Sequence, residues 1–307
     1  MPLSALIALA TASCTYEFPD PNCVESGEVR VEFDWRHVPE GELPEGMGVF
    51  LYHLDDEVYW RYDIRPSGGN ISPQNSHYNI LTYNNDAGAA IFVNIGQFNT
   101  AMASSRPTHL ADGIANYTGA QPPRAKSAGQ EVMSQPDRVV ADALPDVVFR
   151  TNAYDTITFT PKPIVARYNV HIGDVSNLES AAQASMSLTN LAAGYLLATR
   201  QPLDVAATVP GSLEKSSETS LEGSILNYGC LPSATENWLA VYVWLRDGQK
   251  MVFQYDVHDQ IASAPDPMNV DIYLNGIQLP SVETKPEGGL DVGVDNWEII
   301  DIELSNR

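Results

Sequence analysis

Short segments in which apolar and polar residues alternate recur along this chain, and they constrain its fold more than any other feature. Gly27–Trp35 (GEVRVEFDW) shows the pattern most clearly, with Val, Val, Phe and Trp on one side and charged residues on the other. A period of two residues is typical of a β-strand with one buried face. We expect further strands at Gly48–His53, Tyr59–Ile64, Ser76–Tyr83, Ala89–Ile95, Val147–Arg150, Thr156–Thr160, Ile164–Ile172, Trp238–Leu245, Lys250–Val257 and Asn296–Leu304.

Turn-forming residues separate these segments. The 307 residues include 21 Gly and 21 Pro, which is too many for a helical bundle. Asp247-Gly248 and Asn275-Gly276 have the composition of two-residue β-hairpin turns, the second of them in the middle of Asp271–Leu279. We expect loop structure over Gly96–Pro145 and over residues 208–224.

One segment has a helical composition. Asn177–Leu197 is rich in Ala, Leu and Met, and either Ser176 or Asn177 can cap a short helix that begins at Leu178. Gly194 and several Ser and Thr residues argue against one continuous helix. The expectation is a short helical segment within an otherwise β-rich region.

Pro161-Lys162-Pro163 marks the expected domain boundary, because proline cannot donate a hydrogen bond within a β-ladder. The boundary leaves an N-terminal domain at 27–160 and a C-terminal domain at 161–307, both of ordinary domain size. Regular short strands with turns between them predict an all-β protein built from two tandem antiparallel β-sandwiches, with the short helical segment in the second.

The charge balance limits the partners. Lys and Arg together number 17 and Asp and Glu 39, which gives a net charge of −22. Binding to nucleic acid needs clustered Lys and Arg opposite the phosphates, so this composition excludes a nucleic-acid-binding protein. A hydrophobic content of 44% is sufficient for a folded core.

The amino terminus resembles an export signal. The first 13 residues (MPLSALIALATAS) are uncharged and largely apolar, and Cys14 follows them. We interpret residues 1–14 as a lipoprotein signal that ends at the lipidation cysteine Cys14, and residues 15–26 as a tether; several acyl chains would hold the protein firmly on a membrane. No basic residue precedes the apolar run, and Thr11 stands where such signals usually carry Leu. The alternative is that Leu3–Ala12 forms an ordinary strand or helix with Cys14 buried.

Chemical motifs are scarce elsewhere. Cys23 and Cys230 form a possible disulfide in an exported chain, with two free buried thiols as the open alternative. The sequence lacks the spacings of zinc sites, nucleophile elbows and phosphate-binding loops, so we assign no catalytic residue, metal ligand or cofactor. His258, flanked by acids in YDVHD, and Asp55-Asp56-Glu57 are more simply explained as turns than as metal sites.

The order of several phrases resembles the fimbrillin-like outer-membrane lipoproteins of Bacteroidetes, in particular the anchor or minor-subunit branch of type V pili. That resemblance implies two transthyretin-like β-sandwiches, a lipid-anchored, surface-exposed position on the outer membrane or in the fimbrium, and partnership with other fimbrial subunits by strand donation. It also implies a role in adhesion to a host or bacterial surface ligand. The phrases span most of the chain: VRVEFDW (Val29–Trp35), GMGVFLYH (Gly46–His53), Gly68–Asp86, TFTPKPIVARYNVHI (Thr158–Ile172), Asn177–Leu197, FQYDVHDQI (Phe253–Ile261) and DNWEIIDIEL (Asp295–Leu304).

The expected function is therefore that of a non-catalytic fimbrial anchor or accessory subunit. The alternative is a carbohydrate-binding surface lipoprotein, which would display a flat platform of two or three solvent-facing Trp or Tyr side chains. A third possibility, a secreted hydrolase, would show a cleft with converging carboxylates of raised pKa.

Overall fold

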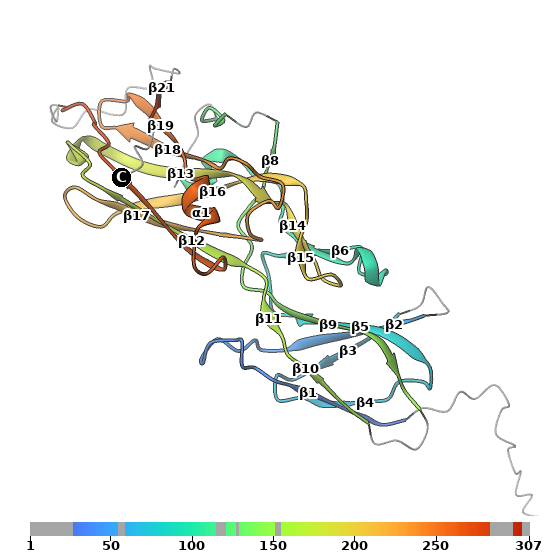
Figure 1. The fold of residues 1–307 in the computed structure, drawn as a ribbon. Coiled ribbons are helices and arrows are strands. Elements are labelled where there is room, and N and C mark those ends of the chain that lie inside the picture. The colour runs from blue at the N-terminus through green and yellow to red at the C-terminus, as the bar shows by residue number, and fades with distance from the viewer. Residues whose placement is uncertain are drawn as a thin grey trace, which may run out of the picture.

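The computed structural model describes residues 27–54, 59–114, 121–126, 129–150, 155–282 and 297–302. Most of the regular structure in these residues is β-strand, which confirms the all-β prediction. Figure 1 shows an elongated molecule, with β1–β5 and β9–β11 at one end, β12, β13 and β16–β21 at the other, and β6, β14 and β15 between them. None of the described helices is long and apolar enough to span a membrane.

Two facing sheets form a sandwich in the first half. Buried side chains of the two sheets pack against each other in one core. Val31, Ile71 and Phe159 come from the smaller sheet, and Leu51 and Ile80 come from the larger. The smaller sheet has the order β10 (Asp155–Phe159), β1 (Val29–Phe33), β4 (Gly69–Ile71). The larger has the order β11 (Lys162–Pro163), β9 (Val140–Val148), β5 (His77–Asn84), β2 (Met47–His53), β3 (Tyr59–Ile64).

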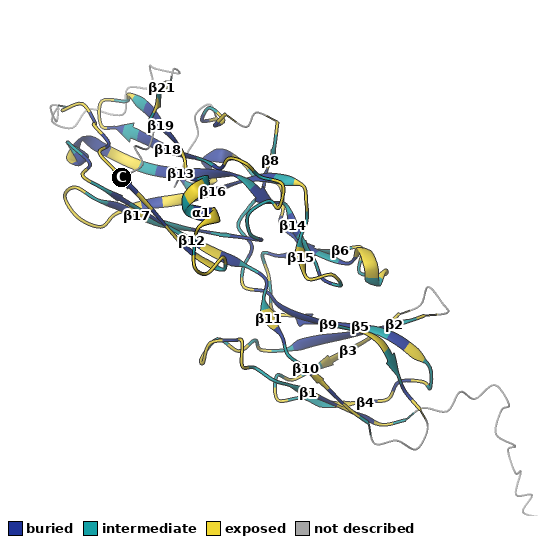
Figure 2. Cartoon of the chain, in the orientation of Figure 1, coloured by how far each residue is buried: buried dark blue, intermediate teal, exposed yellow. Residues whose placement is uncertain are grey.

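A third, four-stranded sheet lies between the two ends of the molecule and covers the outer face of the larger sheet (Figure 2). Phe50 and Tyr83 from the sandwich pack there against Ala103 and Leu197. Strands from both halves of the sequence contribute to it, because β7 pairs with β14. Its order is β15 (Gln201–Pro202), β14 (Gly194–Leu196), β7 (Met102–Ser104), β6 (Ile91–Val93).

The second half is a sheet folded on itself around the largest core. The long strand β16 pairs with β13 along its body and with β17 at Glu214 and Lys215, so it joins the two layers. Tyr168 and Ile272 from one layer meet Val241 and Phe253 from the other, all fully buried. The order is β20 (Asn269–Asn275), β12 (Ala166–Gly173), β17 (Leu221–Asn227), β16 (Ala206–Lys215), β13 (Ala181–Ala192), β18 (Trp238–Leu245), β19 (Lys250–Asp256), β21 (Trp297–Asp301).

Helical structure is confined to short pieces. Among the described residues one α-helix occurs, α1 (His258–Ala262), which has five residues and lies beside β20. Three 3₁₀ turns occupy Phe98–Thr100, Leu110–Gly113 and Leu178–Ser180. A short helical turn therefore begins at Leu178 after Asn177, where the sequence predicts one, and α1 lies elsewhere in the second half.

Three local predictions are wrong. Only Leu178–Ser180 of the expected helical region is helical, and β13 follows it, since a central position between β16 and β18 outweighs the helix propensity of Ala, Leu and Met. Residues 208–224, expected as loop, lie largely in β16 and β17. Asn275-Gly276 ends β20 rather than joining a hairpin, because β20 pairs in parallel with β12.

One local prediction is confirmed and another needs refinement. The Asp247-Gly248 hairpin is confirmed, with β18 and β19 antiparallel on either side. The segment expected as a loop from Gly96 onward contains β7, the two-residue strand β8 (Glu131–Val132) and the start of β9.

Most strand pairs are antiparallel, but β1–β10, β12–β20, β16–β8 and β19–β21 are parallel. The division into domains at 160/161 stays a prediction.

Candidate interaction surfaces

The residues singled out from the sequence are only partly within the described chain. Cys14, Cys23 and Asp55-Asp56-Glu57 lie outside it. Cys230 is half-buried, its Sγ is 3.5 Å from Asn237 Oδ1, and burial raises the pKa of its thiol. The Cys23–Cys230 disulfide therefore stays a prediction.

His258 has a structural position at the start of α1. Its Nδ1 lies 2.8 Å from Asn237 Oδ1, and its backbone N–H donates to Asp256 Oδ1. Asn237 is fully buried and also donates to the carbonyl of Thr189 at 2.9 Å. The contacts of His258 therefore attach α1 to the sheet, and no group of three or more His, Cys, Asp or Glu suited to a metal ion occurs within the described ranges.

The aromatic side chains bear on the sugar-binding alternative. Of the aromatic residues that the structure describes, only Tyr59 and Tyr273 are strongly exposed, and they lie on β3 and β20 in different sheets. Trp238, Trp244 and Trp297 instead cluster with buried Tyr242 on the outside of the second-half sheet. The described residues therefore form no flat platform of two solvent-facing rings.

Three carboxylates in the described ranges have a shifted pKa, and all three lie at the surface. The pKa values of Asp34, Asp63 and Asp271 all lie below the ordinary value. For Asp271 the cause is hydrogen bonding from Asn169 and then from His171. These shifts favour the charged form, whereas an acid catalyst needs a raised pKa.

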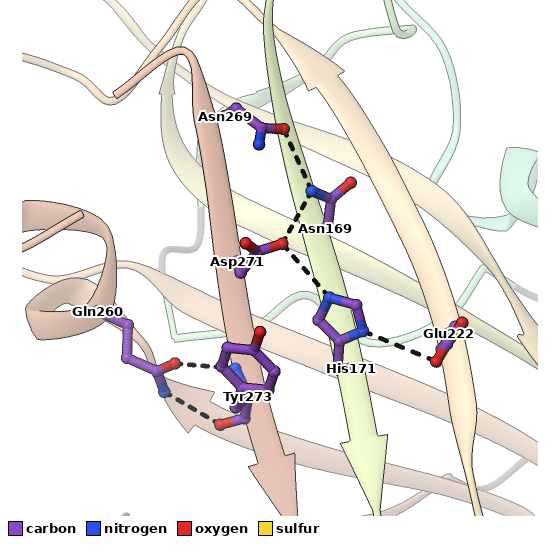
Figure 3. Close-up of polar contacts among 7 residues, drawn as sticks. All are labelled: Asn169, His171, Glu222, Gln260, Asn269, Asp271 and Tyr273. Carbon is purple, nitrogen blue, oxygen red and sulfur yellow. Dashed lines mark hydrogen bonds and ion pairs between the residues drawn. The ribbon is translucent and has the colours of Figure 1, made fainter. Parts of the chain in front are cut away.

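A polar row crosses the outer face of β20, β12 and β17 (Figure 3). Asn169 Nδ2 donates to Asp271 Oδ1 at 3.0 Å, and His171 Nε2 is 3.4 Å from the same oxygen. His171 Nδ1 is 3.8 Å from Glu222 Oε1, and its ring stacks on that of Tyr273 with the centroids 4.9 Å apart. Cross-strand pairs of this kind stabilise a solvated sheet face.

A cleft of about 920 Å³ lies at the junction of the two halves. Its walls include His37 and Leu43 from the first half and Arg167 and Met268 from the second. Arg138 in this wall pairs with Glu42, so its charge is already compensated. Clefts at such junctions are common places for ligands, and this one is lined by charged residues of both signs.

The ends of the sheets provide another kind of surface, because an edge strand carries backbone N–H and C=O groups on one side that no neighbouring strand pairs. The five-stranded sheet ends at β3 and the second-half sheet at β20 and β21. β3 alternates exposed Tyr59, Arg61 and Asp63 with partly buried residues. Such edges accept a strand from another protein by backbone pairing.

Comparison with known proteins identifies the family. A family model described as a domain of unknown function, DUF5119, matches residues 21–211, which is more than half of the chain. The chain belongs to the DUF5119 family. The match covers the first-half sandwich and the connecting sheet and continues into β16. No curated protein sequence matches this DUF5119 chain.

Solved structures share the fold of this DUF5119 protein. A candidate adhesin from Bacteroides ovatus matches with a TM-score of 0.65 at 15% identity, covering 92% of this chain and 100% of the other. The fimbrial anchor protein Mfa2 from Porphyromonas gingivalis matches with a TM-score of 0.54 at 13% identity, over 81% and 90% of the two chains. A candidate polysaccharide-binding protein from Bacteroides thetaiotaomicron matches with a TM-score of 0.53 at 6% identity, over 82% and 91%. The resemblance to fimbrillin-like proteins is confirmed at the level of the fold.

Proposed function

We propose that this DUF5119 protein is a non-catalytic fimbrial or adhesion subunit, exported and held on the outer membrane through a lipid on Cys14. In this role the two β-rich ends form a surface-exposed body that associates with other fimbrial subunits by backbone pairing. Residues 27–160 and 161–307 are the two domains of that body.

One observation carries the proposal: the whole-length match in fold to a candidate adhesin, reaching 92% of this chain and all of the other. The similarity to a fimbrial anchor supports the same role. The physical basis is the open strand edge at β3, where a partner strand can form a ladder of hydrogen bonds.

The lipid anchor also agrees with the sequence. An uncharged apolar run precedes Cys14, and a net charge of −22 gives the body no electrostatic attraction to an anionic bilayer. Firm attachment would therefore depend on the acyl chains, which together bind a membrane far more tightly than one chain does.

The anchor is tested by expressing the full chain and its Cys14→Ala and Cys23→Ala variants in a lipoprotein-processing bacterium of the Bacteroidetes. We expect intact-mass spectrometry to find an acylated Cys14 as the first residue of wild type and of Cys23→Ala, both in the membrane fraction. Cys14→Ala should lack the lipid and leave that fraction. An unmodified Met1 on the mature wild-type protein would contradict the proposal.

The assembly role is tested in the same cells. Fimbriae sheared from the surface are purified, and the chain is sought by immunoblotting both in them and in the membrane that remains. We expect it to co-purify with fimbrial subunits after mild cross-linking, in wild type but not when it is released by Cys14→Ala. Absence from every fimbrial fraction, with the protein lipidated and surface-exposed, would contradict a fimbrial role while leaving the anchor intact.

A further inference from the structure

The edge strand β20 carries a side-chain clamp at its centre (Figure 3). The Oε1 atom of Gln260 accepts the backbone N–H of Tyr273 at 2.8 Å, and its Nε2 donates to the carbonyl of the same residue at 3.1 Å. Both backbone groups of one residue are thus occupied by one amide.

This pair of hydrogen bonds reproduces those of a neighbouring strand. In an antiparallel ladder, facing residues exchange one N–H···O bond in each direction. The carboxamide of Gln260 supplies one acceptor and one donor at that position, as the backbone of a facing residue would. Successive residues of a strand point their backbone groups to opposite sides, so Asp271 and Tyr273 direct theirs to the same open edge.

A second glutamine uses the same chemistry inside the sheet, where Pro210 of β16 has no N–H to donate. Gln135 Nε2 donates to the carbonyl of Pro210 at 2.9 Å, and Gln135 Oε1 accepts the N–H of Leu226 on β17 at 2.8 Å. In this protein a glutamine amide therefore substitutes for strand pairing at two separate places.

The helix that carries Gln260 is firmly attached to the body. Ile261 of α1 is buried in the second-half core, and His258 is bound to buried Asn237. Ser263 closes the helix by donating to the carbonyl of Asp259. The clamp is therefore held at the edge by both apolar and polar contacts, rather than by Gln260 alone.

We propose that α1 and Gln260 form a plug on β20 that prevents this edge from pairing with β20 of a second copy of the chain. With β20 blocked, a strand from another subunit would pair with a different edge of the molecule. Edge strands are aggregation sites unless something blocks them, and a covering helix or a bound side chain is one way to do so.

A second copy is the partner that the uncovered edge fits. An antiparallel pair of β20 strands centred on Tyr273 places Asp271 opposite Asn275 and Ile272 opposite Leu274. No like charges then face each other across the pair, and the apolar side chains continue the core face of the sheet. The net charge of −22 opposes association, so the test is run at moderate salt, which screens it.

The first experiment removes the amide alone, in Gln260→Ala, with Gln249→Ala in the exposed β18–β19 hairpin as the matched control. We expect hydrogen exchange at the Tyr273 amide to become roughly tenfold faster in Gln260→Ala, as the loss of a net hydrogen bond predicts, and to be unchanged in Gln249→Ala. An unchanged rate in Gln260→Ala would overturn the proposal.

The second experiment replaces residues 258–263 by a Gly/Ser linker of equal length in the full chain. Circular dichroism checks folding, and sedimentation velocity measures association. We expect a concentration-dependent dimer, which Asp271→Pro in the same background returns to monomer, because proline removes an open-edge N–H that β12 does not use. A folded linker variant that stays monomeric, or a dimer that survives Asp271→Pro, would overturn the proposal.

Discussion

Two edge strands, β3 in the first half and β20 in the second, have the same alternating pattern but different surroundings. On β20 the inward side chains are fully buried, and Gln260 occupies the open-edge backbone groups of Tyr273. On β3 the inward side chains are only partly buried, and the described residues place no comparable amide on its backbone. Alternation therefore predicts which side chains of an edge strand face the core, whereas the contacts of its open backbone edge depend on elements distant in the sequence.

The largest difference should be found in the inward side chains. Ile272→Ala on β20 removes a side chain with no exposed surface and should lower the free energy of unfolding by about 2–5 kcal/mol. Ile64→Ala on β3 removes a partly buried side chain and should cost roughly half as much. Urea denaturation of both variants measures the two costs, and equal values would show that β3 is as deeply packed as β20.

A smaller effect is expected from the polar face of β3. Arg61 lies over the Phe50 ring, 5.4 Å from its centroid, and its Nη2 is 2.8 Å from Asp63. Arg61→Ala should therefore cost about 0.5–1 kcal/mol, since the side chains of Arg61 and Asp63 are both about half exposed to solvent. Thermal unfolding compares the loss of stability in Arg61→Ala with that in the control Arg65→Ala. Arg65 is an exposed arginine for which the described residues provide no ion pair. Equal losses would show that the Phe50 contact contributes nothing.

The smallest effect concerns pH and acts on both edges. Partial burial raises the pKa of Asp63, but hydrogen bonds from Arg61 and Asn85 outweigh it, so that the pKa is lowered, as it is for Asp271. A lowered folded-state pKa stabilises the fold above about pH 4, and this contribution is lost as the pH falls through the folded-state values. NMR titration should show Asp63 shifting upward in Arg61→Ala and Asp271 in Asn169→Ala. If the pKa values of Asp63 and Asp271 did not change in these variants, Arg61 and Asn169 would not be the cause of the lowered pKa values.

Several elements follow from local sequence because their burial is one-sided. β12 has buried Tyr168, Val170 and Ile172 alternating with more exposed residues, as the alternation in Ile164–Ile172 predicts. The hairpin at Asp247-Gly248 is equally local, since a two-residue turn needs only the adjacent strands. In both cases the information needed lies within about ten residues.

β13 and β16 could not be predicted in this way. In β13, Met186 and Ser187 are both fully buried, one facing the core and the other bonded to Tyr242, so the strand loses its polar face. In β16, Pro210 argues against a central strand, and Gln135 compensates from a distant segment. A sequence window that contains neither Tyr242 nor Gln135 cannot reveal that these polar groups are satisfied.

The candidate functional features also differ in whether local sequence or distant contacts reveal them. Cys14 and the apolar run before it are a sequence feature, independent of any fold, and the lipid anchor is predicted from them alone. The clamp on β20 is not visible in the sequence, because Gln260 and Tyr273 are 13 positions apart and nothing in either residue type marks the pair.

Composition and local patterning are enough to show that this protein is acidic, all-β and built from many short amphipathic strands, because side-chain alternation and turn chemistry act between near neighbours. Which strands lie in the middle of a sheet, which lie at an edge, and where a side chain replaces a missing strand depend on how the chain packs in three dimensions. Those features arise from contacts between residues far apart in the chain, and burial on the second face of a strand is set by whatever packs there.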